Sequence, residues 1–164
     1  MEFVQPTKWR DALEARAEHP DALPIWGGTD VMVELNFARR RPAALLDLTH
    51  VPELARWDAE DGWVRIGAGV SYTRAIAELG SRLPGLAMAS RTVGSPQIRN
   101  RGTIGGNLGS SSPAGDALPP LFAGGASVEV ASVRGSRRVP IEEFVVGPKR
   151  NVLEEDELIA AAVV

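Results

Sequence analysis

A run rich in glycine and serine, Arg101 to Leu121, constrains this chain more than any other stretch. Between Gly102 and Gly115 it holds five glycines and three consecutive serines, with no aromatic residue. Side chains this small bury little apolar area, so the run adds little to a hydrophobic core. It offers backbone N–H groups instead, and turns of successive N–H groups form concave anion sites without Lys or Arg. We expect the rest of the chain to hold this run as a binding loop; an ordinary surface loop is the alternative.

Two glycines of this run suit a close approach by a ligand. Gly105 and Gly106 permit a positive φ and place no Cβ between the main chain and a ligand. We expect further hydrogen-bonding groups from the hydroxyls of Thr103, Ser110, Ser111 and Ser112. The polar residues Asn107 and Asp116 flank the small ones.

A second glycine motif lies near the N-terminus. The apolar segment 23–26 predicts a strand that runs into Gly27-Gly28-Thr29-Asp30, and 31–37 predicts a short helix. Unpaired N–H groups at such a helix start attract anions. The motif lacks the lysine of a Walker loop and the GxGxxG of a Rossmann fingerprint. Two glycine motifs, one in each half of the chain, predict one elongated ligand held from both sides, and a dinucleotide has that shape.

The composition excludes several kinds of chemistry. The chain has no cysteine, hence no disulfide, no thiolate nucleophile and no ligands for an iron–sulfur cluster. His19 and His50 are its two histidines, far apart in sequence, so neither a histidine metal site nor a Ser-His-Asp triad is easily built. Any redox work therefore needs an organic cofactor.

The charge and the hydropathy narrow the partners and the compartment. A formal net charge of −3 and a pI of about 5.5 argue against a nucleic-acid or anionic-membrane partner. No apolar run is long enough to span a membrane, and the first residues lack the apolar core of a signal peptide. We therefore expect a cytoplasmic protein.

The pattern of elements predicts an α+β chain of two lobes. The small βαβ lobe, 1–55, combines a helix over 8–18 capped by Thr7 with strands over 23–26 and 43–48. The larger lobe, 56–164, has a strand over 63–67, a hairpin around Arg134-Gly135 and a last strand over 158–164. Its predicted helices cover 72–79 (capped by Ser71), 86–93 and 117–123.

Three strings of residues resemble a known family. Pro24–Val31 (PIWGGTDV), Thr103–Asn107 (TIGGN) and Ser112–Asp116 (SPAGD) resemble the FAD-binding medium subunit of molybdenum hydroxylases. That family includes xanthine, carbon monoxide, aldehyde and aromatic-substrate dehydrogenases. Gly67-Ala68-Gly69 and Gln97–Asn100 match as well, so the resemblance covers nearly the whole chain. It implies the p-cresol methylhydroxylase-type FAD fold, in which FAD lies between a small βαβ lobe and a larger mixed-sheet lobe.

The resemblance also implies which residues bind the cofactor. Those expected to wrap the FAD pyrophosphate are Pro24, Ile25, Trp26, Gly27, Gly28, Thr29, Asp30 and Val31. Those expected to oppose them are Thr103, Gly105, Gly106 and Asn107. Asp116 is either an acceptor for a cofactor hydroxyl or the N-cap of the next helix. Val93 and Ile159 are either apolar cofactor contacts or core residues, and Gln97–Asn100 is either a strand leading into the loop or a direct contact.

The implied function is electron transfer, with no catalytic residue of the chain's own. FAD would receive electrons from the iron–sulfur small subunit and pass them to an acceptor such as NAD or a quinone. The substrate would react on a separate molybdenum-cofactor large subunit. Because no cysteine and no suitably placed histidine offers a tether, non-covalent FAD is expected. The alternatives are a self-contained flavin oxidase and a non-redox nucleotide-binding module.

The chain departs from the family pattern at three places. Trp26 is bulkier than the small residue usual before the glycine pair, and Gly109 and Ser110 are smaller than is common. The chain stops at Val164, where the family continues into a C-terminal domain that covers one side of the cofactor.

Overall fold

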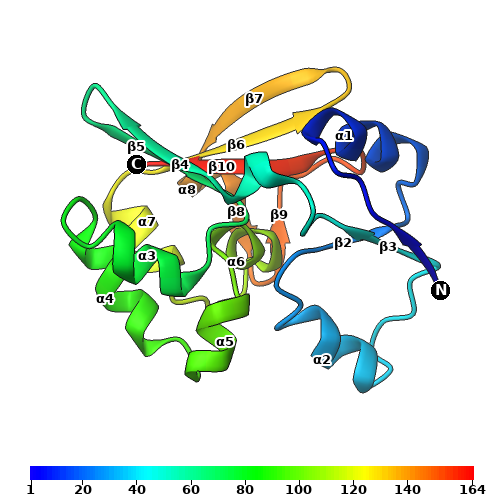
Figure 1. Ribbon diagram of the computed structural model, residues 1–164, viewed down its shortest axis with the longest axis horizontal. Helices are drawn as coiled ribbons and strands as arrows, with labels where there is room; N and C mark the ends of the chain where they lie inside the picture. Colours follow the sequence, from blue (N-terminus) through cyan, green and yellow to red (C-terminus); the bar gives the residue numbers. More distant parts are fainter.

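The computed structural model describes residues 1–164, which form an α+β structure built on two main sheets. The first is a three-stranded parallel sheet in the order β1-β3-β2. Its strands are β1 (Glu2–Val4), β2 (Leu23–Ile25) and β3 (Ala44–Asp47). Helices α1 (Trp9–Glu18) and α2 (Val31–Asn36) make the two connections. We call this part the small lobe; it is drawn in blue and cyan in Figure 1.

The second sheet has five strands in the order β4-β5-β10-β6-β7, and every neighbouring pair is antiparallel. The family resemblance implied a sheet with both parallel and antiparallel pairs, whereas all pairs of this sheet are antiparallel. Its strands are β4 (Trp57–Glu60), β5 (Trp63–Gly67), β6 (Ser127–Ser132), β7 (Gly135–Pro140) and β10 (Leu158–Val163). The last strand in sequence, β10, occupies the centre of the sheet. We call residues 56–164, which carry it, the large lobe.

Helices cover the lower side of the five-stranded sheet in Figure 1. They are α3 (Tyr72–Glu78), α4 (Pro84–Thr92), α5 (Pro96–Arg101), α6 (Ile104–Ser110) and α7 (Leu118–Ala123). A 3-10 turn, Pro52–Ala55, leads into β4, and α8 (Ile141–Phe144) leads into the small hairpin of β8 (Val145–Gly147) and β9 (Arg150–Asn151). No helix has the length and apolar character that crossing a bilayer requires.

Each lobe has a hydrophobic core cluster of its own. The larger cluster lies between the five-stranded sheet and the helices, where Phe144, Ile66 and Leu108 are completely buried. The smaller one packs α1 against the parallel sheet around Leu46. Leu158, at the start of β10, belongs to this smaller cluster, so the central strand of one lobe also contributes to the core of the other.

Most of the predicted elements are confirmed, but four short strands were missed: β1, β4, β8 and β9. β4 pairs with β5 through a tight turn at Asp61 and Gly62, whose φ values are 49° and 83°. An Asp-Gly pair between alternating residues is a strong hairpin signal, so β4 was predictable. β1 has three residues and no buried side chain, so its sequence carries no periodic signal.

Two local predictions were wrong. The residue at the start of α1 is Lys8, so Thr7 is not the cap, and no side chain caps the helix. Gln97–Asn100 is helical instead of forming a strand, because Ser95 Oγ accepts the Ile98 N–H at 3.4 Å and Pro96 occupies the first turn of α5. A serine followed by proline is a helix-start pattern.

Candidate functional site

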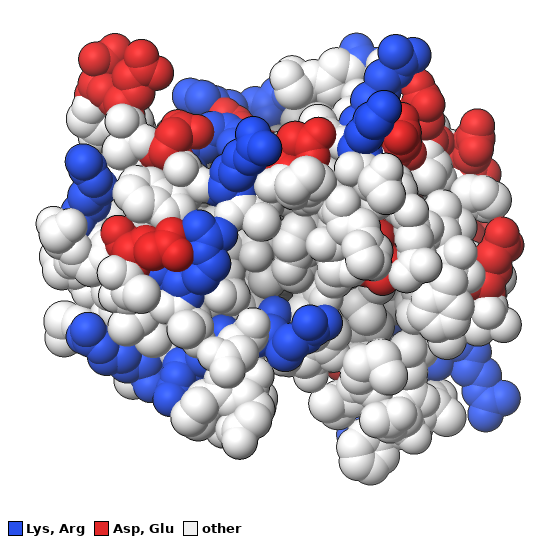
Figure 2. All heavy atoms as spheres, viewed as in Figure 1, with Lys and Arg blue, Asp and Glu red and all other residues white.

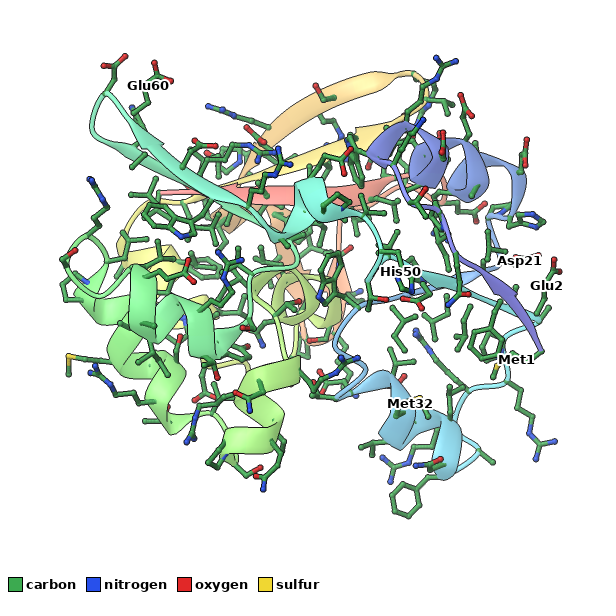
Figure 3. The ribbon with its side chains drawn as sticks, viewed as in Figure 1. Met1, Glu2, Asp21, Met32, His50 and Glu60 are labelled. Atoms are coloured by element: carbon green, nitrogen blue, oxygen red, sulfur yellow. The ribbon has the colours of Figure 1, made fainter.

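The two glycine motifs, far apart in sequence, meet in the structure. A Cβ on Gly27 would lie 2.1 Å from the carbonyl oxygen of Arg101 and 3.1 Å from the Cα of Gly102. Such contacts are impossible for any other residue without a backbone shift, so glycine is required here. Figure 2 shows the surface notched between α2 and α5, below this contact. Figure 3 shows Met32 on α2, the small-lobe wall of that notch.

The loop between β2 and α2 carries backbone donors without acceptors. The five consecutive N–H groups from Trp26 to Asp30 donate to no backbone or side-chain acceptor in the protein. Four of these residues are half-buried, and Gly28 has a φ of 75°, the left-handed conformation found in turns that bind anions through successive N–H groups. Backbone N–H groups away from bulk water are nearly always hydrogen-bonded. We therefore expect water or a bound anion to accept hydrogen bonds from this row of donors.

The other residues expected from this segment adjoin the row. Pro24 and Ile25 close β2, where they pair with Leu46 and Asp47 of β3. Asp30 is the exposed residue at the start of α2 and makes no side-chain capping bond, and Val31 begins the helix. The whole expected segment therefore forms one strand–turn–helix, as the sequence predicted.

The second motif has a different form from the one expected. Its glycines are not in an open loop with positive φ, because Ile104–Ser110 is helix α6. Thr103 is buried, and its Oγ1 accepts the Gly106 N–H at 2.9 Å as the helix cap. The Gly105 N–H donates to the Ala68 carbonyl at 2.9 Å. The N–H groups of both glycines are therefore already used inside the protein.

Packing explains the two glycines of α6. A Cβ on Gly105 would lie 2.4 Å from the Cβ of Ala68 and 2.6 Å from its carbonyl oxygen. Gly105 thus lets α6 lie directly on the turn after β5. Gly106 is exposed, and a Cβ there would have one close neighbour, the Thr103 Oγ1 at 3.1 Å.

The serine hydroxyls that were expected to face a ligand bond to the chain instead. Ser110 Oγ donates to the Asn107 carbonyl at 3.1 Å, and Ser111 Oγ donates to the Leu108 carbonyl at 2.7 Å. Ser112 Oγ accepts the Ala114 N–H at 3.3 Å. Small hydroxyl residues at a helix end readily bond to nearby backbone, so all three hydroxyls have partners within the chain, and a contact of any of them with a ligand stays a prediction.

Asn107 and Asp116 lie on adjacent segments. Asn107 Oδ1 accepts the Ala117 N–H at 3.1 Å, and a Cβ on Gly115 would lie 2.5 Å from the Asn107 amide nitrogen. Asn107 therefore holds the loop before α7 against α6. Asp116 does not cap α7, since the N-cap residue is Ala117 and it makes no side-chain bond. The Asp116 carboxylate is half-exposed and accepts a hydrogen bond from Thr92 Oγ1 at 3.2 Å.

Val93 and Ile159 both belong to the large-lobe core. Their exposed fractions are 8% and 9%, and both pack in the larger cluster. The Ile159 Cδ1 lies 3.6 Å from where a Cβ on Gly109 would be, so Ile159 lies beneath α6. The structure therefore shows core roles for both residues, and a cofactor contact by either stays a prediction.

Two neighbours of the site were missed from the sequence. The Trp26 ring packs against Gly69, where a Cβ would lie 2.4 Å from the Trp26 Cζ2. The bulk of Trp26 is thus accommodated by a glycine of the facing lobe. Tyr72 packs against Gly102, with its Cε2 3.0 Å from the position of a Cβ there. Neither pairing has a signal in the sequence, because each joins residues distant along the chain.

The lobes also meet through an ion pair at the hairpin of β8 and β9. Lys149 Nζ lies 3.5 Å from Glu34 Oε1 of α2. The Lys149 N–H donates to the Ser111 carbonyl, and Asn151 Nδ2 donates to the Gly109 carbonyl at 3.0 Å. The hairpin of β8 and β9 thus links the end of α6 in the large lobe to α2 in the small lobe.

The match to a family model agrees with this geometry. The model described as "FAD binding domain in molybdopterin dehydrogenase" matches residues 1–164. The chain belongs to this family. Its cofactor is therefore FAD, and the free donors of the Trp26–Asp30 loop, beside the Gly27–Gly102 contact, fit the pyrophosphate of a dinucleotide.

Curated relatives and solved structures of this FAD-binding family resemble the chain. It is 36% identical to the xanthine dehydrogenase FAD-binding subunit of Escherichia coli O157:H7, over 92% of this chain and 53% of that protein. It is 35% identical to the nicotinate dehydrogenase FAD-subunit of Eubacterium barkeri, over 100% of this chain and 58% of that protein. Quinoline 2-oxidoreductase from Pseudomonas putida 86 superposes on the whole chain with a TM-score of 0.97 at 27% identity, over 58% of that chain. The chain thus spans little more than half the length of these relatives.

Proposed function

We propose that the chain binds FAD non-covalently in the notch between its lobes and serves as the electron-transfer part of a molybdenum hydroxylase-type dehydrogenase. The observation that carries this proposal is the row of five backbone N–H groups, Trp26 to Asp30, without a protein acceptor. The row lies where the small lobe touches Gly102 of the large lobe. A dinucleotide such as FAD suits this junction, because its anionic pyrophosphate lies between two bulkier groups.

The proposed roles follow from which polar groups are free. The Trp26–Asp30 donors would hold the pyrophosphate oxygens, and the exposed Gly106 on α6 would let the cofactor lie close to the helix. The half-exposed Asp116 carboxylate would accept from a hydroxyl of the cofactor. Bound FAD supplies one-electron and two-electron transfer. The chain's own contribution is to bind and orient it.

Partner subunits are proposed from the relatives and from the composition. Similar proteins are named as subunits, among them the caffeine dehydrogenase subunit beta of Pseudomonas at 36% identity over 97% of this chain. The chain has no cysteine to ligate an iron–sulfur cluster. We therefore propose that an iron–sulfur subunit delivers electrons to the FAD, that a molybdenum-cofactor subunit oxidises the substrate, and that NAD or a quinone accepts the electrons.

A pair of glycine variants tests the role of the donor loop. Gly28→Ala places a side chain at a φ of 75° in the loop, and Gly62→Ala does the same at 83° in the β4–β5 turn, away from the notch. Each change costs about 1–2 kcal/mol of stability, because non-glycine residues resist the left-handed region. We expect FAD affinity, measured by flavin fluorescence titration, to fall at least tenfold in Gly28→Ala and to stay unchanged in Gly62→Ala. Equal affinity in both variants would contradict the proposal.

Acid precipitation tests the non-covalent attachment. The FAD-loaded protein should release its yellow colour to the supernatant, since the chain has no cysteine and two histidines. His19 ends α1, and His50 follows β3, where Figure 3 labels it. Colour that remains with the pellet would show a covalent bond.

A further inference from the structure

Tyr72 supports the point at which the two glycine motifs meet. It is the first residue of α3, it is 5% exposed, and its N–H donates to the Gly102 carbonyl at 3.1 Å. Its ring atoms Cε2 and Cδ2 lie 3.0 and 3.2 Å from the position of a Cβ on Gly102. Gly102 is also the residue that Gly27 of the small lobe approaches. Tyr72 is therefore packed directly against the junction of the lobes.

The Tyr72 hydroxyl makes no hydrogen bond to the protein. Arg16 Nε is the single fully enclosed side-chain nitrogen or oxygen that lacks a partner. The Tyr72 oxygen therefore keeps contact with solvent although the rest of the side chain is buried. Buried tyrosines normally place the hydroxyl on a partner, so an open hydroxyl at a ligand-binding junction indicates a donor reserved for a ligand.

The charges around Tyr72 come from both lobes. Burial raises the pKa of its hydroxyl well above the ordinary value, and the negative charges of Asp116 and Asp30 raise it further. The hydroxyl consequently stays protonated and can donate at any physiological pH. Asp116 and Asp30 are the two carboxylates of the expected site, so the hydroxyl lies within the electrostatic reach of both sides of the notch.

We propose that the Tyr72 hydroxyl donates a hydrogen bond to an oxygen of bound FAD in its pyrophosphate–ribityl segment. This role rests on the proposed function. The segment is rich in acceptors, since its phosphates are anionic, whereas the two nearby carboxylates can only accept. A neutral donor fixed on α3 supplies what these carboxylates lack, and it adds a large-lobe donor opposite the Trp26–Asp30 row.

The variant Tyr72→Phe tests this role, because it removes the hydroxyl and keeps the ring that packs on Gly102. A hydrogen bond to a charged oxygen that is lost in this way should weaken FAD binding about tenfold. Ser132→Ala is the matched control. It deletes another buried hydroxyl, one that accepts the Arg134 N–H in the β6–β7 hairpin and lies outside the notch, so FAD affinity should not change.

A second measurement uses the fact that Tyr72 is the sole tyrosine of the chain. Protein labelled with ¹³Cζ-tyrosine gives one resonance, which should shift during FAD titration as the hydroxyl acquires an acceptor. Tyr72→Phe that binds FAD as tightly as wild type overturns the role. A weaker-binding Tyr72→Phe with a lowered melting temperature, together with an unmoved wild-type resonance, shows a structural role and also overturns it. Wild-type protein that binds no FAD refutes the proposed function together with this role.

Discussion

Replacing Gly105 with alanine tests whether this glycine serves helix packing. The new methyl group would lie 2.4 Å from the Ala68 Cβ, about 1 Å short of an ordinary contact. The helix α6 would have to move away from the turn after β5, at an overpacking cost of about 1–3 kcal/mol. The movement would also weaken two hydrogen bonds of about 1 kcal/mol each, from the Gly105 N–H to Ala68 and from the Ile104 N–H to Val70. Alanine returns about 1 kcal/mol through helix propensity, so we expect a net loss of about 2–4 kcal/mol.

Urea unfolding followed by tryptophan fluorescence measures this loss, and Gly109→Ala provides the control in the same helix. A Cβ on Gly109 would meet the Ile159 Cδ1 at 3.6 Å, an ordinary contact, and Gly109 is exposed. The control should therefore be as stable as wild type or more stable by up to about 1 kcal/mol. Equal stability of the two variants would refute the packing explanation of Gly105.

Three further outcomes follow from the contacts. Hydrogen bonds from Arg137 to both carboxylate oxygens hold the pKa of Glu157 below its ordinary value of 4.5. The Arg137–Glu157 pair therefore stabilises the fold fully above about pH 4.5, and this stabilisation is lost as the pH falls through the lower pKa of the folded state. Wild type should therefore lose more melting temperature between about pH 5 and pH 3 than Glu157→Gln does; parallel curves would contradict this. Leu46 is fully buried in the small-lobe core, so Leu46→Ala should lower the free energy of unfolding in urea by about 2–5 kcal/mol. A loss below about 1 kcal/mol would argue against that burial. Gly27→Ala, with its methyl 2.1 Å from the Arg101 oxygen, should cost about 1–3 kcal/mol and also weaken FAD binding; unchanged affinity would separate Gly27 from the site.

The sequence predicted the periodic elements well. Alternation and apolar runs located β5, the β6–β7 hairpin and β10, and the expected Ser71 cap of α3 is confirmed by its bond to the Arg74 N–H at 3.3 Å. The strand–turn–helix around Gly27 was also predicted, because an apolar run, a glycine pair and a short helical pattern follow one another there. These features depend on neighbours along the chain, which a single sequence displays.

Two errors had local signals that were overlooked, the Asp-Gly turn before β5 and the Ser-Pro start of α5. Others concern residues whose environment is set by distant parts of the chain. Composition alone makes the TIGGN string look like a loop, yet Thr103 caps a helix there and Ala68 packs against Gly105. A glycine demanded by helix packing and one demanded by a turn are identical in sequence. The contacts of Tyr72 with Gly102 and of Trp26 with Gly69 are likewise invisible until the two lobes come together.

The central place of β10 in the five-stranded sheet determines when this sheet can close during synthesis. The β4–β5 and β6–β7 hairpins can each form from local sequence, but β5 and β6 each have one side that pairs with β10 alone. Until Leu158–Val163 has been made, both hairpins expose an open edge with unpaired N–H and C=O groups. At about 5–20 residues per second, β5 waits for several seconds before its partner arrives. The growing chain thus carries both open edges, which favour aggregation, until β10 emerges and pairs with them.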